Sequence, residues 1–426
     1  MREMKNSGIE WIGDISSEWN LIKLCYVTDD IFLGKTPIYS EEHNENYTLG
    51  QKNNQLYGID FNGIKFSTDE HFNACKENEF LKYGDILLNS LGTGSVGRIG
   101  FFDSNKRMLT DGHIIVIRPN NKINNKYLFY YLRTLRKKFE DDAVGSTNQA
   151  FLTVPKIYKT LVPFPDAYMQ KKIADFLDEK CAEIDTVIEK TRATIEEYKK
   201  LKQSVITQAI TKGIRPNCPM KDSKNIWFGN IPFDWEIQKI KYVFTIKKDI
   251  AGVEGYTVLS ITQRGITPKD LSKNEGQLAE NYSKYQLVNI GDFAMNHMDL
   301  LTGWVDISKF SGVTSPDYRV FMLNDKNKNS DKFYLYLMQM CYFNRIFYGL
   351  GQGVSGMGRW RLQADKFLNF TIPVPPTVEQ KEIADYLDKK CSEIDELITK
   401  KTSLLSELES YKKSLIYEYV TGKKEV

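Results

Sequence analysis

The side chains best able to do chemistry in this sequence are amides, hydroxyls and basic groups that gather in loops. The candidates in the first half are Lys52, Asn53, Asn89, Ser90, Arg98, Thr147, Asn148 and Gln149, and those in the second half are Thr262, Gln263, Arg264, Asn296, Arg359 and Arg361. Asn and Gln can pair with adenine through two hydrogen bonds and Arg with guanine, whereas Lys, Ser and Thr can hold phosphates. Because these loops recur at equivalent places in both halves, we interpret them as candidate base-reading loops.

One glycine-rich segment, Gly92 to Gly97, matches the G-x-G-x-x-G pattern of nucleotide-binding loops. Such a loop needs a helix directly behind it, so that the helix N-terminus meets a phosphate. Here Arg98 to Asp103 follows, which is typical of a strand, and the second half has LLTGWVDI in place of the pattern. We therefore expect a loop between two strands.

Motifs of catalysis and metal binding are missing from the sequence. The histidines lie far apart and in no metal-ligand spacing, at positions 43, 71, 113 and 297. Pro316-Asp317 is not followed within about twenty residues by the Asp/Glu-x-Lys of a nuclease, and no Asn/Asp-Pro-Pro-Tyr/Phe, G-x-S-x-G or Walker A occurs. Six cysteines form no C-x-x-C pair. We expect neither a catalytic nor a metal site.

The segments expected to position these loops occur as an internal repeat, with the two copies 210 residues apart. Lys171–Asp185 (KKIADFLDEKCAEID) and Lys381–Asp395 (KEIADYLDKKCSEID) are identical at eleven of fifteen positions. Upstream, VPFP at 162–165 matches IPVP at 372–375, and WIGDISSEW at 11–19 matches WFGNIPFDW at 227–235. Matching blocks with variable segments between them indicate one scaffold used twice, with divergent loops.

Each repeated block opens a long helix with apolar residues every seven positions. Leu177 and Ile184 form one series and Cys181 and Ile188 the other, and the second copy repeats both. We call the two interleaved series of each helix its seam; the series are interrupted by polar residues at positions 191, 202, 401 and 412. This heptad pattern predicts a coiled coil. Antiparallel packing of the two helices on each other is favoured over separate packing of each helix on its own domain.

The ends of both helices are also marked in the sequence. We expect Asp166 to cap the first helix and Thr377 with Gln380 to form a capping box on the second. Gly213 and Gly422 should end them. About 41 residues at ~1.5 Å each gives a length of roughly 60 Å per helix.

The remaining segments are expected to be mixed α and β. A Gly-Asp turn precedes an apolar strand in each half, and further strands are expected at Ile114–Arg118 and Arg319–Leu323. A tyrosine-rich helix should follow each, at Lys126–Phe139 and Lys332–Phe347, its aromatic residues forming core. The fold class is α+β: two tandem mixed α/β domains and two long helices in a pseudo-two-fold repeat.

Together these motifs resemble the specificity subunit of type I restriction-modification systems. The resemblance implies two target recognition domains, 1–165 and 215–375, and two conserved spacer helices, 166–214 and 376–426. It implies a non-catalytic subunit that binds double-stranded DNA at a bipartite, asymmetric site. Two modification subunits carrying S-adenosylmethionine would methylate adenine, and restriction subunits using ATP and Mg would cut, so this chain itself would hold no cofactor.

Composition bounds the remaining alternatives. The net charge is only +3, no apolar run approaches the roughly 18 residues of a membrane span, and no signal-peptide core is present, so we expect a cytoplasmic protein. A stand-alone DNA methyltransferase or nuclease, and a coiled-coil scaffold without a DNA role, stay open as alternatives. The DNA target and its spacer length are not legible in the sequence, because DNA shape also contributes to recognition.

Overall fold

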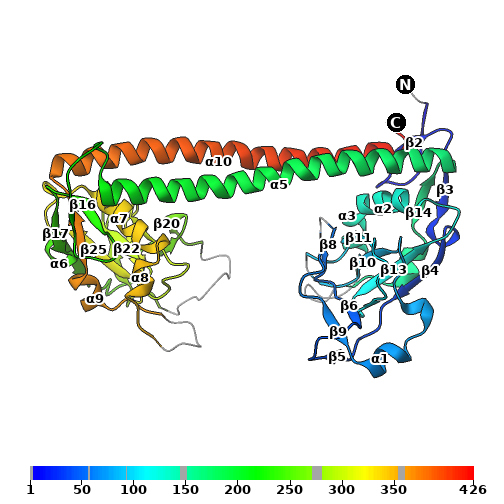
Figure 1. The fold of residues 1–426 in the computed structure, drawn as a ribbon, viewed down its shortest axis with the longest axis horizontal. Coiled ribbons are helices and arrows are strands. Elements are labelled where there is room, and N and C mark those ends of the chain that lie inside the picture. Colours follow the sequence, from blue (N-terminus) through cyan, green and yellow to red (C-terminus); the bar gives the residue numbers. More distant parts are fainter. Residues whose placement is uncertain (1–2, 56–57, 93, 144–150, 271–280, 354–359) are drawn as a thin grey trace. The chain divides into compact units, whose positions relative to one another are not determined.

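The structure is a computed structural model that describes residues 3–55, 58–92, 94–143, 151–270, 281–353 and 360–426 (Figure 1). It divides into two compact units. Unit 1 comprises Met1–Arg192 with Ser403–Val426, and unit 2 comprises Ala193–Thr402. Among the described residues, no helix combines the length and the apolar character that a membrane span requires.

Unit 1 is built on a four-stranded antiparallel sheet. Its strands, in spatial order, are β11 (Ile99–Phe101), β10 (Ile86–Asn89), β13 (Ile114–Pro119) and β4 (Thr28–Leu33). Both faces of β10 are buried: Ile86 and Leu88 join the main core, and Leu87 joins a second cluster with Leu49 and Phe102. Alternate side chains of a strand point to opposite faces, so the whole strand can be apolar.

Smaller strands complete unit 1. A second sheet has the order β12 (Leu109–Thr110), β6 (Tyr47–Leu49), β9 (Lys65–Ser67) and β5 (Tyr39–Ser40), and three pairs are β1 (Met4–Asn6) with β2 (Asp14–Ser16), β3 (Asn20–Lys23) with β14 (Leu161–Phe164), and β7 (Asn54–Gln55) with β8 (Gly58–Ile59). Short helical segments are η1 (Leu24–Tyr26), α1 (Asp69–Ala74), η2 (Glu77–Glu79) and α4 (Val154–Tyr158).

Unit 2 repeats the same central sheet. Its strands are β23 (Val305–Ile307), β22 (Phe293–Met295), β25 (Arg319–Leu323) and β18 (Phe244–Lys247), in the spatial order of their counterparts in unit 1. The other pairs are β15 (Met220–Asp222) with β16 (Asn230–Pro232), β17 (Glu236–Lys239) with β26 (Thr371–Val374), β19 (Leu259–Thr262) with β20 (Gly265–Pro268), and β21 (Gln286–Val288) with β24 (Gly312–Thr314); short helices are α6 (Ile240–Val243) and α9 (Ala364–Asn369). The repeated strand order confirms the duplication.

The Gly-Asp turns lead into β10 and β22, as the sequence predicts. Gly84 and Gly291 adopt φ values of +92° and +87°, which favour glycine. Asp85 then pairs with Arg118 at 2.7 Å, and Asp292 pairs with Lys247 at 2.7 Å, all four side chains being largely buried. Each carboxylate also accepts the backbone N–H three residues before it. The motif therefore closes a turn and balances a buried cation.

Each tyrosine-rich segment forms two helices, so the prediction of one continuous helix is wrong in both halves. The segments are α2 (Asn125–Thr134) with α3 (Arg136–Asp142), and α7 (Asp331–Phe343) with α8 (Ile346–Gly349). Leu135 leaves helical geometry at ψ 8°, and Arg345 adopts φ +57°. Leu135, at the first break, and Phe139, in α3, are both buried. Core packing overrides local helix propensity here. The aromatic residues do form core, as expected.

The long helices α5 (Ala167–Lys212) and α10 (Thr377–Val420) have 46 and 44 residues, somewhat more than the sequence indicated. Gly213 and Gly422 follow their ends at φ +71° and +73°, so both predicted stops are confirmed. Asp166 caps α5 as predicted, since its Oδ1 accepts the N–H of Met169 at 2.8 Å.

The predicted capping box on α10 is wrong. Thr377 Oγ1 donates to the Lys328 carbonyl at 3.0 Å, and the N–H of Gln380 donates to the Pro376 carbonyl. The Gln380 side chain instead accepts the N–H of Ser330 at 2.8 Å and donates to the Pro375 carbonyl at 2.9 Å. These groups are used in tertiary contacts with the segment before α7, which a local motif does not reveal.

A repeated polar joint ties each long helix to its domain. Gln170 makes the same two bonds as Gln380, accepting the N–H of Asn124 and donating to the Pro165 carbonyl, each at 2.8 Å. Asn124 and Ser330 are themselves the N-caps of α2 and α7. One amide therefore links the first turn of each long helix to the start of the tyrosine-rich helix.

A second part of the joint is a tyrosine–aspartate bond. Tyr130 donates to Asp178 at 2.6 Å, and Tyr336 donates to Asp388 at 2.8 Å. Lys126 and Lys332 pair with the same two carboxylates. Burial raises the pKa of both phenols, and the hydrogen bond to the carboxylate raises it further by a smaller amount. Both tyrosines therefore stay neutral and act as hydrogen-bond donors.

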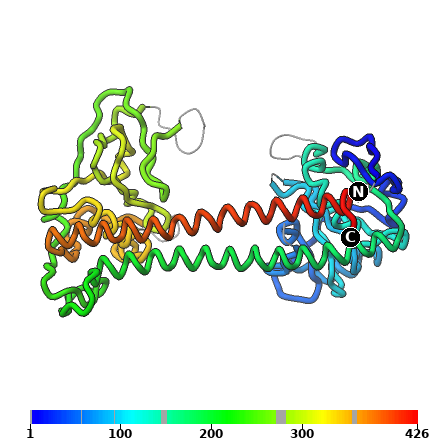
Figure 2. Tube along the Cα trace, turned by 90° about the horizontal axis from the view of Figure 1, so that it is seen from above, coloured from blue at the N-terminus to red at the C-terminus, as the bar shows by residue number. Residues whose placement is uncertain are grey.

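The two long helices lie side by side and run antiparallel within each unit (Figures 1 and 2). In unit 1 Asp185 pairs with Lys412 and Arg192 with Glu409, and in unit 2 Lys202 pairs with Asp395 and Arg215 approaches Glu382. Partner numbers on α10 fall as those on α5 rise. The seam residues are buried as predicted: Leu177, Cys181, Ile184, Ile188, Leu387, Cys391 and Ile394.

The lysines that interrupt the seam make reciprocal ion pairs. Lys412 contacts Asp185 at 2.5 Å, and Lys202 contacts Asp395 at 2.6 Å. The two pairs are the same pair in the two copies of the repeat, since each partner is matched at an offset of 210. A charged group at a seam position favours one register, because any shift would leave it buried without a partner.

We predict that Asp185→Asn will destabilise unit 1 by about 1–3 kcal/mol, because it leaves the buried Lys412 without its carboxylate. The expected loss is smaller than for a fully buried ion pair, because the Asp185 side chain is 35% exposed while that of Lys412 is 9% exposed. The additional change Lys412→Met should restore most of the loss. Denaturant unfolding followed by circular dichroism measures both.

The matched control is Asp395→Asn. Its partner Lys202 is 30% exposed and Asp395 is 54% exposed, so the loss should be about 1 kcal/mol or less. Equal losses at the two aspartates would contradict the argument from burial.

Candidate nucleic-acid interface

In unit 1 the predicted reading loops meet at the end of β10. Asn89, the last residue of that strand, is fully buried. Its Nδ2 donates to the Gln51 carbonyl at 3.1 Å, and its Oδ1 accepts Asn54 Nδ2 at 2.9 Å. Asn89 therefore holds the loop after β6 against the loop after β10.

Two more predicted residues also point inward. Asn53 Oδ1 accepts the N–H of Gly50 at 3.0 Å and its Nδ2 donates to the Asp60 carbonyl at 2.8 Å. Ser90 donates to the His113 carbonyl at 2.9 Å. Lys52, directly before Asn53, is exposed. The loop thus presents Lys52 to solvent while Asn53 and Ser90 fix its shape.

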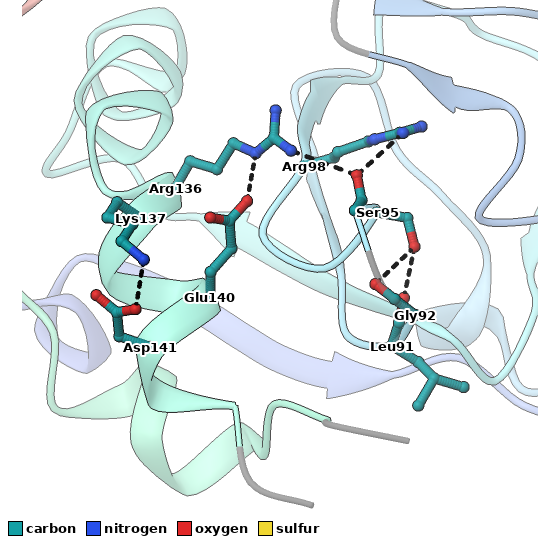
Figure 3. A network of polar contacts seen from close by, with 9 residues as sticks. Leu91, Gly92, Ser95, Arg98, Arg136, Lys137, Glu140 and Asp141 are labelled. Carbon is teal, nitrogen blue, oxygen red and sulfur yellow. Dashed lines mark hydrogen bonds and ion pairs between the residues drawn. The ribbon is translucent and has the colours of Figure 1, made fainter. Parts of the chain in front are cut away.

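The glycine-rich loop connects β10 to β11, so the expected loop between strands is confirmed. Ser95 Oγ donates to the carbonyls of Leu91 and Gly92 at 2.8 and 3.1 Å. Figure 3 shows Arg98 and Arg136 directed toward the part of this loop that carries Ser95, and both guanidinium groups donate to the Gly94 carbonyl, at 3.1 and 3.3 Å. Arg98 also donates to Gln55 Oε1 at 3.1 Å.

Thr147, Asn148 and Gln149 lie outside the described residues. The residues directly after them do contact the reading loops: Leu152 donates its N–H to the Ser90 carbonyl at 2.8 Å, and Phe151 forms a β-bridge with Leu91. The first-half candidates that the structure describes are therefore brought together around the ends of β10 and β11.

In unit 2 the predicted residues occupy separate loops. Thr262, Gln263 and Arg264 are exposed and form the turn of the β19–β20 hairpin. Thr262 Oγ1 accepts the N–H of Arg264 at 3.1 Å, and Gln263 Nε2 donates to the Thr302 carbonyl at 3.2 Å. The hairpin turn therefore presents an arginine to solvent.

The side chain of Asn296 is engaged by the fold, whereas that of Arg361 faces solvent. Asn296 Oδ1 accepts the N–H groups of Met298 and Asp299, each at 3.2 Å, and so shapes its own turn. Arg361 is exposed, and its backbone pairs with Gln352. Arg359 lies outside the described residues.

A buried arginine beside these loops was missed by sequence reasoning. Arg319 is 5% exposed, donates to the Leu362 carbonyl at 2.8 Å, and burial lowers its pKa to about 10. Burial, then Arg319 and Arg361, lower the pKa of His297 to about 3, so His297 is neutral. An arginine opening the apolar run RVFML was the available signal.

A cleft in unit 1 lies between the reading loops and the long helices, with a volume of about 720 Å³. It is lined on the domain side by Gly97–Ile99 and the α2–α3 corner, and on the helix side by α5 and α10. Its charged residues are Arg98, Arg133, Arg136, Lys137, Lys412 and Lys413 with Glu140, Asp185 and Glu409. Of these only Arg98 was a sequence candidate.

Unit 2 has the counterpart of this cleft, with a volume of about 1240 Å³ between β22–β23, α7 and the long helices. Trp304, Gln339 and Gln203 line it. By the repeat they stand where Arg98, Arg133 and Lys413 stand in unit 1. No cluster of three His, Cys, Asp or Glu side chains suited to a metal ion occurs among the described residues of either unit.

Comparison with known proteins explains the repeated loops and clefts. The chain matches the family model of the type I restriction modification DNA specificity domain twice, over residues 18–197 and 232–407. The chain belongs to this family. The two matches coincide with the two copies of the repeat, so each unit carries one specificity domain.

Individual relatives agree with the specificity-domain assignment. The type I restriction enzyme MjaVIII specificity subunit of Methanocaldococcus jannaschii is 29% identical over 389 residues, covering 88% of this chain and 86% of the relative. The putative MjaX specificity subunit of the same organism is 26% identical over 238 residues, which is 54% of this chain and about half, 53%, of that relative.

A solved structure shares the fold. It concerns complex assembly and conformational transition of the type I R-M system, and one of its chains superposes with a TM-score of 0.68 at 13% identity, covering 95% of this chain and 98% of that one. The resemblance, the fold class and the DNA-specificity role expected from the sequence are confirmed. The family is one of DNA recognition and not of catalysis, and neither alternative function gains support.

We predict that the specificity domain in unit 2 loses stability as pH falls from about 6.5 toward 3, in part through His297. Its pKa is lowered in the folded state, so the unfolded state binds the extra proton across that window. The contribution is present above pH 6.5 and is lost at up to about 1.4 kcal/mol per pH unit below it.

The test compares thermal unfolding of the wild type and His297→Gln at pH 7.5 and pH 5. Between pH 7.5 and pH 5 the midpoint temperature of unfolding should fall further for the wild type than for the variant. Parallel losses would show that His297 does not titrate differently in the folded and unfolded chain.

Proposed function

We propose that this chain is the specificity subunit of a type I restriction-modification complex in which each unit reads one part of a bipartite, asymmetric DNA site. One observation carries the proposal: the two units share the same strand order, helix joint and seam, but their exposed loops differ. A shared frame with different loops is what two readers of unlike sequences need. The family and the names of the relatives support the assignment.

Within this proposal the base-reading groups are the exposed ones. Gln263, Arg264 and Arg361 in unit 2 face solvent from loops, and an arginine can recognise guanine through two hydrogen bonds. Lys52, exposed in unit 1, would hold a phosphate beside the base that is read. Asn53, Asn89, Ser90 and Asn296 would act by holding those loops in shape, because their side chains are engaged by the fold.

The helices α5 and α10 would set the separation of the two half-sites. Each contributes residues to both units. A continuous helix of 46 residues is about 69 Å long, which corresponds to roughly two turns of DNA. A rigid pair of such helices would fix the spacer between the half-sites.

The chemistry of the complex would come from partner subunits. Two modification subunits would supply S-adenosylmethionine and methylate adenine, and restriction subunits would supply ATP- and Mg-dependent cutting. The exposed faces of the two repeated long helices would provide two equivalent docking places. Since its ligand is cellular DNA, the complex would act in the cytoplasm.

We predict that Gln263→Ala with Arg264→Ala will relax recognition at one half-site and leave the other unchanged. Loss of a bidentate contact to a base costs about 1–3 kcal/mol of discrimination. The assembled complex is incubated with a duplex library, and methylated adenines are mapped by sequencing.

Thr267→Ala, in β20 of the same hairpin and also exposed, is the matched control. It should leave both half-sites as in the wild type. If the double variant altered both half-sites together, independent reading by the two units would be ruled out.

We predict that lengthening both long helices will widen the spacer. Seven residues are added to α5 after Arg192 and seven to α10 after Thr402, so that the heptad pattern and the antiparallel pairing are kept. Each addition lengthens its helix by about 10 Å, equal to roughly three base pairs. Methylation mapping should find the same half-sites at the wider spacing. An unchanged spacer with full activity would refute the role of the helices.

A further inference from the structure

The basic cleft of unit 1 is more cationic than the shared scaffold requires. Three of its positions, Arg98, Arg133 and Lys413, are occupied in unit 2 by Trp304, Gln339 and Gln203. The cleft of unit 2 has cations at other positions: Lys202, Lys332 and Lys199 are paired with Asp395, Asp388 and Glu196, and Arg345 and Lys400 also line it. The repeat therefore does not need cations at these three positions, and their presence in unit 1 favours an anionic ligand there.

Two guanidinium groups converge on one neutral acceptor at the cleft. Arg98 comes from the loop before β11 and Arg136 from the first turn of α3, and both donate to the Gly94 carbonyl (Figure 3). Like charges held this close repel each other, and an anion placed between them would be stabilised. Arg98 Nε is in addition buried and without a hydrogen-bond partner within the described residues.

The acidic partners of this cluster are weak competitors. Arg136 pairs with Glu140 at 2.9 Å and Lys137 with Asp141 at 2.7 Å, both one helical turn apart and partly or fully exposed. Exposed pairs of this kind contribute little to stability, because water screens the charges. The side chains can therefore turn toward a stronger anion, and the exposed Lys413 on α10 faces the same cleft from the helix side.

The cleft is continuous with the reading loops. Gly97–Ile99 line it, and the strand end just before that loop carries Asn89 and Ser90. An anion bound in the cleft would thus lie next to any base read by these loops. The phosphates flanking a recognised base are the anions that meet this requirement.

We propose that the cleft of unit 1 binds the sugar-phosphate backbone of the DNA beside the half-site read by that unit, with Arg98, Arg136, Lys137 and Lys413 as phosphate contacts. The inference rests on the proposed function. The grip on the backbone differs between the two units, because unit 2 has Trp304 and Gln203 at the positions of Arg98 and Lys413. These four residues anchor the DNA and do not choose its sequence.

The test is a triple variant, Arg136→Gln, Lys137→Gln and Lys413→Gln, assembled with the modification subunits. Binding to a cognate duplex and to a duplex with one mismatched half-site is measured by fluorescence anisotropy between 50 and 200 mM salt. Affinity should fall by the same factor for both duplexes, and the slope of log K against log salt should become shallower by about two to three.

The control variant removes the same charge elsewhere in unit 1, through Lys5→Gln, Lys76→Gln and Lys122→Gln, which are exposed and outside the cleft. It should keep the wild-type slope. A second variant, Glu140→Gln, frees Arg136 and should raise affinity for both duplexes, a gain that misfolding could not produce.

The outcomes separate this inference from the proposed function. If the wild-type complex does not discriminate the cognate duplex, the proposed function fails. If it discriminates and the triple variant matches the control variant, the phosphate site is refuted. If the triple variant binds DNA normally but no longer retains the modification subunits on gel filtration, the cleft takes an acidic protein segment and the inference is overturned.

Discussion

The fold depends first on the antiparallel seam between α5 and α10. Neither helix could remain exposed, because each carries an apolar stripe, and in each unit the stripe is buried against both the other helix and the core of the domain. The seam is not purely apolar. One reciprocal pair, Asp185 with Lys412 in unit 1 and Lys202 with Asp395 in unit 2, places charge at equivalent seam positions. An apolar seam alone tolerates slippage, whereas a charge that has one partner in one register does not. The seam thus selects a register as well as excluding water.

The polar joint fixes the position of each recognition domain on the long helices. Gln170 and Gln380 connect the first turn of a long helix to the N-cap of the tyrosine-rich helix, and the Tyr130–Asp178 and Tyr336–Asp388 bonds continue the contact about two turns further along. The tyrosine-rich helices in turn position the central sheets, since α2 packs on β11 and α7 packs on β23. Loops at the ends of these strands are therefore attached to the helix by a short chain of buried contacts, and they can change in sequence without disturbing it.

Much of this architecture could be predicted from the sequence. Heptad spacing gave the seam, positive-φ glycines gave the helix ends, and a Gly-Asp pair gave the start of β10 and β22, because each of these is a local pattern with a local cause. The breaks at Leu135 and Arg345 follow no glycine or proline and are set by core packing. Thr377 and Gln380 match a capping box in sequence but bond to residues some fifty positions away.

The candidate site shows the same limit. Amides chosen for their ability to read bases proved in several cases to be engaged by the fold, as Asn89 is with Gln51 and Asn54. Sequence also cannot gather Arg136 with Lys413, which lie 277 positions apart yet line one cleft. Residue type shows what a side chain is able to bind, while its availability is decided by contacts that only the folded chain brings together.

The most direct measurement of the central claim is the pattern of methylated adenines in host DNA, read by single-molecule sequencing with and without this chain. We expect one asymmetric motif of two unlike parts, separated by a fixed gap, with an adenine methylated in each part and with all of these marks lost when the chain is deleted. A contiguous or palindromic motif, or marks that persist without the chain, would contradict it.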